Sequence, residues 1–281
     1  MIKLFTDSTC DLSKDLLERY DISVIPLYIQ LGDKSFKDGI ELLPNQIYEW
    51  ANENKKTPKT SSPDLASVIS ALSEFDNEGT EIIYTGISES MSSTISVIRL
   101  AAEELKYAKV YAIDSMNLST GIGLQLLRMG KLREEGLSAQ EIVNRITADR
   151  CKVKAGFVVD TLEYLYRGGR CNAVTALFAS ALKIKPEIAV TDGHMVVARK
   201  FRGNIHSVIE KYVNGLKEEI SKADEEHIFI THSGGVEDIA EEIKSQIEAM
   251  GYFKEIHITT AGGVIASHCG PKTLGVLFYS K

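Results

Sequence analysis

Apolar residues in the first half of the chain alternate between runs typical of strands and spacings typical of helices. The predicted strands are residues 2–5, 22–29, 82–85 and 110–113. The predicted helices are residues 11–20, one that starts at Ser62-Pro63-Asp64, one that carries residues 98–105, residues 121–133, and one that starts at the capping box of Ser138. Strands separated by helices imply crossover connections, so we expect a mostly parallel sheet covered by helices on both faces, in three layers.

The pattern changes after about residue 154. Asp192-Gly193 separates two apolar runs, at residues 184–190 and 195–198, and predicts a hairpin. The predicted elements that follow are helices at 205–216 and 236–250 and strands at 228–231, 256–259 and 274–279. We therefore expect two α/β domains, residues 1–153 and 154–281, with a mixed sheet in the second.

Composition narrows the functional classes. The 281 residues carry a net charge of −7, which argues against the basic stripe of a nucleic-acid-binding protein. The four cysteines are far apart and lack metal-ligand spacing, as expected of reduced thiols in the cytoplasm. The first residues become polar too soon for a signal peptide, and no apolar run is long enough for an integral membrane segment.

Three hydroxyl-rich turns follow the predicted strands. They are Thr60-Ser61-Ser62-Pro63, residues 88–94 (SESMSST), and the segment from Asp114-Ser115 to Ser119-Thr120. Helix starts bind anions through free N–H groups, so these turns, expected at the carboxyl ends of the strands, predict an oxyanion site without a metal or cofactor. The alternative is plain helix capping, by Ser62 in the first turn and by Ser92 or Ser93 in the second.

Two further segments carry candidate ligand-binding side chains. A Gly-Gly pair lies between Arg167 and Arg170, where a guanidinium would suit a carboxylate or phosphate, although a surface turn with solvated arginines has the same sequence. His268 lies among small residues, which we interpret as backbone turns that a ligand approaches closely. A lone histidine is more often structural.

Taken together, these segments resemble the DegV family of bacterial fatty-acid-binding proteins. The matching pieces are TDSTCDL (residues 6–12), Thr60-Ser61 before Pro63, residues 88–94, Asp114-Ser115, residues 165–170, Ile184-Lys185-Pro186 and SHCGP (residues 267–271). They occur in order along essentially the whole chain, and this order makes the resemblance specific.

The resemblance implies a non-catalytic carrier that holds a long-chain fatty acid between two domains. Thr60 and Ser92 match the hydroxyls that bind the carboxylate, Ser61 and Ser93 lie beside them, and His268 completes the polar network. Arg170 matches an arginine near the carboxylate, and Arg202 matches a basic position associated with kinase docking. A separate ATP-dependent fatty acid kinase would phosphorylate the bound acid for phospholipid synthesis, and transient contact with a membrane surface is compatible with this role.

Three positions depart from the family pattern: Ser93 and Lys272 replace common glycines, and Ser62 replaces a longer polar residue. The competing hypothesis is a serine hydrolase or acyltransferase with Ser92 as nucleophile and His268 as base. Against it, the chain has no G-x-S-x-G elbow, and no acid is clearly placed to orient His268.

Overall fold

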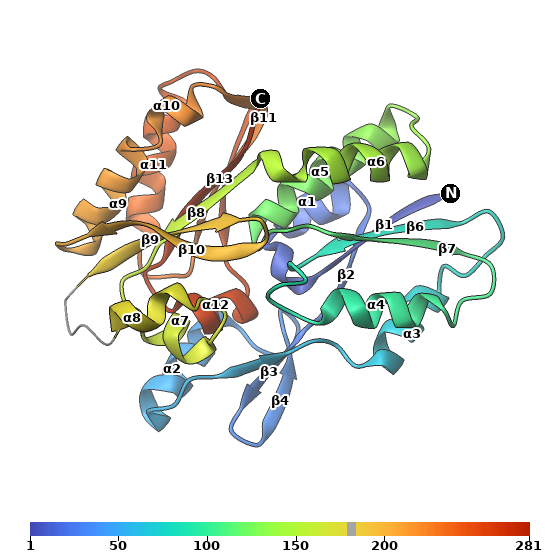
Figure 1. Cartoon of the computed structure of the whole chain (residues 1–281), viewed down its shortest axis with the longest axis horizontal. Coiled ribbons are helices and arrows are strands. Elements are labelled where there is room, and N and C mark those ends of the chain that lie inside the picture. The colour runs from blue at the N-terminus through green and yellow to red at the C-terminus, as the bar shows by residue number, and fades with distance from the viewer. Residues whose placement is uncertain (179–183) are drawn as a thin grey trace.

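The computed structural model describes residues 1–178 and 184–281 (Figure 1). Within these residues the strands form a four-stranded sheet, a six-stranded sheet and a small three-stranded sheet. The expected pair of α/β units, one with a parallel and one with a mixed sheet, is confirmed. The six-stranded sheet begins at Val153, while the domain boundary at 153/154 stays a prediction.

The four-stranded sheet is parallel throughout and has helices on both faces. Its strands, in spatial order, are β2 (Ile22–Ile25), β1 (Ile2–Asp7), β6 (Glu81–Gly86) and β7 (Lys109–Asp114). One face packs against α3 (Leu65–Ser73) and α4 (Thr94–Ala102). The other face packs against α1 (Lys14–Arg19), α5 (Thr120–Glu134) and α6 (Ala139–Asp149). This is the predicted three-layer arrangement, and α6 begins with the predicted capping box of Ser138 and Glu141.

The six-stranded sheet is mixed, because only β11 and β12 pair in parallel. Its strands, in spatial order, are β10 (His194–Phe201), β9 (Lys185–Thr191), β8 (Val153–Val158), β13 (Leu274–Ser280), β11 (Ala223–His232) and β12 (Glu255–Thr260). Its outer face is covered by α9 (Ile205–Asn214) and α11 (Glu237–Glu248), with α10 (Lys217–Ile220) at one end. Asp192 and Gly193 have φ values of 48° and 78°, as the predicted two-residue hairpin requires.

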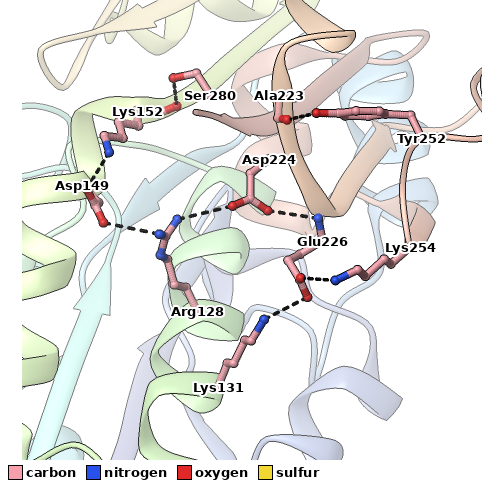
Figure 2. A network of polar contacts seen from close by, with 10 residues as sticks. All are labelled: Arg128, Lys131, Asp149, Lys152, Ala223, Asp224, Glu226, Tyr252, Lys254 and Ser280. Carbon is pink, nitrogen blue, oxygen red and sulfur yellow. Dashed lines mark hydrogen bonds and ion pairs between the residues drawn. The ribbon is translucent and has the colours of Figure 1, made fainter. Parts of the chain in front are cut away.

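Helix α5 packs against both sheets, contacting β1 on one side and β8 and β13 on the other. A single apolar core therefore joins the sheets. At one end of α5, Arg128 lies 3.4 Å from Asp149 and 4.0 Å from Asp224, and Lys131 lies 3.1 Å from Glu226 (Figure 2). These ion pairs border a cavity of about 280 Å³, called the charged cavity below. It is lined by Leu124, Leu127, Arg128, Lys131, Leu132, Glu135, Arg145, Asp224, Glu226, His227 and Tyr279.

The small antiparallel sheet was not predicted from the sequence, and neither was β8 of the six-stranded sheet. The strands of the small sheet are β4 (Lys34–Lys37), β3 (Tyr28–Leu31) and β5 (Lys59–Ser61). Together with α2 (Pro44–Asn54) it packs against α12 (Gly263–Cys269) rather than against the four-stranded sheet. The prediction of one strand over residues 22–29 is wrong, because the chain leaves β2 before Pro26, which has no N–H to donate, and enters the small sheet as β3.

Two local predictions are also corrected. Asp64, not Ser62, caps α3: its Oδ1 accepts a hydrogen bond of 2.9 Å from the Ser67 amide, which satisfies a free donor of the first turn. The segment around His268, interpreted as backbone turns, forms the buried helix α12. The remaining elements are 3-10 turns at Ser8–Cys10 and Arg150–Lys152 and the short helices α7 (Glu163–Gly168) and α8 (Ala173–Phe178). Among the described residues no helix is long and apolar enough to cross a membrane.

Candidate functional site: a hydroxyl-lined pocket

A pocket of about 270 Å³ opens where β5, the turn before α4, and helix α12 meet. We call it the hydroxyl pocket. It is lined by Leu27, Thr60, Ser61, Ser62, Ile87, Met91, Ser92, Ser93, Leu118, Arg170, Met195, Val264, Ile265, His268 and Cys269. Six of the seven side chains predicted from the sequence thus line one pocket, although they come from segments more than 200 residues apart.

The turn of residues 88–94 is held in place by a buried carboxylate. Asp7, at the end of β1, accepts hydrogen bonds from the Ile87 amide at 2.9 Å and from the Tyr84 hydroxyl at 2.7 Å. The Ser88 amide donates to the Asn117 carbonyl at 2.9 Å. These contacts fix the chain as it leaves β6, so Ser92 and Ser93, at the start of α4, line the pocket.

The serines at the pocket mouth contact one another in pairs. Ser62 Oγ lies 3.1 Å from Ser93 Oγ, which joins the first hydroxyl turn to the second. Ser92 Oγ lies 2.8 Å from the Thr94 hydroxyl and accepts a 3.3 Å hydrogen bond from the Thr94 amide. Ser92 therefore supports the start of α4 and lines the pocket at the same time, while Ser93, the N-cap residue, makes no side-chain cap hydrogen bond.

His268 reaches from α12 to β5, where its Nε2 lies 2.7 Å from Thr60 Oγ1. Burial, followed by the nearby Arg170 charge, lowers the pKa of His268 to about 4, so the ring is neutral at pH 7. Its other nitrogen, Nδ1, is buried without a partner in the described part of the chain. Since burying an unpaired N–H is less favourable than burying an unpaired acceptor, the proton belongs on Nε2. His268 then donates to Thr60, whose own hydroxyl proton stays available for an anion in the pocket.

Helix α7 packs against α12 beside His268. A Cβ atom added to Gly168 would lie 2.3 Å from His268 Nδ1, so only glycine permits this approach. The following residue, Gly169, ends the helix at a φ of 66° and turns the chain toward Arg170. The Arg170 guanidinium donates to the Gly168 carbonyl at 2.8 Å and remains exposed at the pocket mouth. Gly168 thus leaves room for the His268 ring, and Gly169 turns the chain so that Arg170 lies at the pocket mouth.

Other predicted residues lie elsewhere. Arg202 is exposed between β10 and α9 and does not line the hydroxyl pocket. Ser119 and Thr120 of the third hydroxyl turn do not line the hydroxyl pocket either. Ser119 donates to Asp11, and the Thr120 hydroxyl lies 2.7 Å from the Thr231 hydroxyl in the protein interior. The expectation that all three turns lie at the ends of parallel strands is wrong for the first, because Thr60 and Ser61 belong to the antiparallel β5.

The contacts do not assemble a catalytic triad. The imidazole of His268 contacts Thr60 instead of Ser92, whose hydroxyl contacts Thr94. Among the described residues no carboxylate lies at Nδ1 of His268 to orient the ring. A serine nucleophile needs both of these contacts to be activated.

The apolar side of the pocket leads into the protein. A smaller cavity of about 30 Å³ behind it shares three lining residues with it, Leu118, Ile265 and Cys269, and continues toward Phe157 and Leu277. The sequence analysis missed these lining residues, because their apolar spacing is the same as that of ordinary core. Lys272, noted in the sequence as a departure from glycine, has a φ of 60° and packs near Gly235, outside the pocket lining.

Comparison with known proteins agrees with this architecture. A family model described as "Uncharacterised protein, DegV family" matches residues 1–281. The chain belongs to the DegV family. A DegV domain-containing protein from Clostridium perfringens is 35% identical over 99% of this chain and 98% of the relative.

Two solved DegV structures are similar over the full length. A DegV family protein from Thermus thermophilus, described for its fatty acid binding, has a TM-score of 0.90 and 30% identity and covers 100% of this chain and 99% of its own. DegV from Bacillus subtilis, described as a fatty acid binding protein, has a TM-score of 0.89 and 27% identity, with the same coverage. Both proteins share the fold that creates the hydroxyl pocket here.

Proposed function

We propose that this DegV protein binds a long-chain fatty acid, with the carboxylate in the hydroxyl pocket and the acyl chain directed into the apolar interior. The observation that carries the proposal is the meeting of Thr60, Ser92 and His268 at the mouth of a pocket whose far side is apolar. The fatty acids bound by its DegV relatives support the same ligand class.

The polar end suits an ionised carboxylate. A buried carboxylate without partners would lose hydration and would favour its neutral form. Here the Thr60 hydroxyl, oriented by His268, and the Ser92 and Ser61 hydroxyls offer donors, while the start of α4 and Arg170 add positive potential. Because His268 is neutral, the negative charge is balanced by dipoles and by Arg170 at the mouth.

The apolar end accounts for affinity. Each methylene transferred from water to an apolar environment contributes about 0.8 kcal/mol. Ile87, Met91, Val264 and Ile265 line this end, and the passage through Leu118 and Cys269 gives the chain a route inward. The tail therefore dominates binding, and the hydroxyls set the orientation.

We further propose that the protein presents the acid to a separate ATP-dependent fatty acid kinase, which makes an acyl phosphate for phospholipid synthesis, and does no chemistry itself. The exposure of Ser61, Ser93 and Arg170 at the pocket mouth supports this role, because a partner could approach the carboxylate from solvent. Arg202, exposed beside β10, is the proposed docking residue away from the pocket.

The first experiment is mass spectrometry of a solvent extract of the protein purified from a bacterial host. We expect a stoichiometric long-chain fatty acid. Repeated recovery of lipid-free protein that also fails to take up added fatty acid would contradict the binding proposal.

The kinase role is tested separately, in a coupled assay with ATP, fatty acid and a bacterial fatty acid kinase. Thr60→Ala and Ser92→Ala should reduce acyl-phosphate formation, whereas Arg202→Gln should reduce it while leaving fatty acid content unchanged. Normal turnover by all three variants would refute the presentation role without affecting the binding result.

A further inference from the structure

Two histidines and a glutamate converge on the inner face of the six-stranded sheet, away from the hydroxyl pocket. His227 lies on β11, and Glu255 and His257 lie on the neighbouring parallel edge strand β12. His227 pairs with Glu255 in the strand register, and residues two apart on a strand point to the same face. One candidate ligand atom from each of the three side chains lies within 4.8 Å of the others.

The spacing of these atoms matches that of ligands around a small metal ion. His227 Nδ1 lies 3.2 Å from His257 Nε2, and His257 Nε2 lies 3.7 Å from Glu255 Oε2. Bonds of about 2.0–2.1 Å in a tetrahedral zinc site place neighbouring ligand atoms roughly 3.3 Å apart. The two nitrogens thus already lie at nearly the required separation, and the carboxylate oxygen, which lies within 4.8 Å of both nitrogens, has to move closer to His227 to bind the same ion.

Neighbouring side chains hold the three ligands and leave them accessible. The His257 ring stacks on Phe229 with centroids 4.6 Å apart, which fixes its orientation. Glu255 is held by Arg19 of α1, whose Nη1 lies 3.0 Å from Oε1 and 3.1 Å from Oε2. His227 lines the charged cavity, which gives an ion a path from solvent.

We propose that His227, Glu255 and His257 form a binding site for a divalent transition metal ion of the zinc class. Two imidazoles and one carboxylate suit zinc, cobalt, nickel or copper, whereas magnesium and calcium prefer oxygen ligands throughout. Three protein ligands leave a fourth position for water. A bound ion would tie the edge strand β12 to β11.

Arg19 lowers the affinity of this site for a metal ion, so its replacement is the sharpest test of the proposal. Its positive charge is repelled by a metal ion, and it shares Oε2 of Glu255 with the proposed ion. The ion pair between Arg19 and Glu255 persists through Oε1 when Oε2 binds the metal ion. Arg19→Gln should therefore raise metal affinity several-fold, a gain that a purely structural role for the three ligands would not produce.

The experiment uses the full chain, free of any histidine tag and treated with a chelator, titrated with Zn²⁺ by calorimetry. We expect one Zn²⁺ per chain, no comparable binding of Mg²⁺, and a Co²⁺ complex with the visible absorption of a four-coordinate site. His257→Gln and His227→Gln should each weaken Zn²⁺ binding by about tenfold or more.

The matched control is His206→Gln. His206 Nε2 lies 2.9 Å from Glu242 Oε2 on a different face of the protein, and among the described residues no third ligand completes a metal site there. His206→Gln should leave Zn²⁺ affinity unchanged. Thermal unfolding without metal shows whether each variant folds. Zn²⁺ should raise the unfolding temperature of the wild type, Arg19→Gln and His206→Gln more than that of His227→Gln or His257→Gln. The proposal is overturned by the lack of saturable Zn²⁺ binding, or by a site that survives both His227→Gln and His257→Gln.

Discussion

The hydroxyl pocket and the charged cavity have nearly the same volume, about 270 and 280 Å³, but opposite chemistry. In the charged cavity four of the charged side chains are already paired: Arg128 pairs with Asp149 and Asp224 and lies over the Tyr279 ring, and Lys131 pairs with Glu226. In the hydroxyl pocket the side chains are uncharged apart from Arg170, and hydroxyl protons remain available.

The difference shows that neither volume nor the number of charges identifies a ligand site. Paired charges have little attraction left for an anion, since each would have to break an existing contact. A hydroxyl held by a neutral histidine loses nothing when its proton turns toward a carboxylate. We therefore expect changes in the hydroxyl pocket to alter fatty acid binding, and changes to the paired charges of the charged cavity to alter stability slightly.

The largest effect is expected for Thr60→Val, which keeps the shape of the side chain and removes the hydroxyl. Hydrogen bonds to charged groups contribute about 1.5–3 kcal/mol, so fatty acid affinity should fall roughly 10- to 100-fold. Displacement of a fluorescent fatty acid measures it. Lys131→Met in the charged cavity is the control and should bind normally. Equal affinities of Thr60→Val and wild type would place the carboxylate elsewhere.

The next effect concerns Asp11, which accepts a 2.7 Å hydrogen bond from the Gly262 amide at the start of α12. Burial raises the pKa of Asp11 to about 8, above its ordinary value of 3.8. The native state then binds the proton more tightly than the unfolded state, so stability falls as pH rises between these values. Burial lowers the pKa of His268 from 6.5 to about 4, so its contribution makes stability rise with pH, but only up to about pH 6.5.

Between pH 6.5 and 8 the wild type should therefore lose up to about 2 kcal/mol of unfolding free energy relative to Asp11→Asn. Asparagine keeps the acceptor for Gly262 and has no charge to bury. Urea unfolding at several pH values measures the difference. Parallel pH profiles for the two proteins would show that Asp11 stays ionised in the native state.

The sequence predicted the layers well, because the hydrophobic period reports which face of an element is buried. It also named most of the polar side chains of the hydroxyl pocket, mainly through the family resemblance. It could not place β3 to β5 and α2, since their packing on α12 depends on residues about 200 positions away. The role of Gly168 also depends on a partner distant in sequence, His268, so no local pattern marks it.

Gly168→Ala should weaken fatty acid binding by about tenfold, the equivalent of one hydrogen bond, because the new methyl group displaces the His268 ring from Thr60. Gly169→Ala is the matched control, since it meets no atom within 4 Å and strains the backbone at a φ of 66° instead. It should lower stability by about 1 kcal/mol and leave affinity unchanged. The same affinity in both variants would mean that His268 does not orient Thr60.

The smallest effect is expected for Lys131→Met in the charged cavity. The Lys131 side chain is 49% exposed, and Glu226 retains a second partner in Lys254, so the lost ion pair should cost at most about 0.5 kcal/mol. Thermal unfolding at low and high salt measures it, and the difference from wild type should shrink as salt screens the charges. Lys254→Met, on the other side of the same carboxylate, should behave alike (Figure 2). If either variant lost fatty acid, the charged cavity would take part in ligand binding, and the contrast between the two cavities would fail.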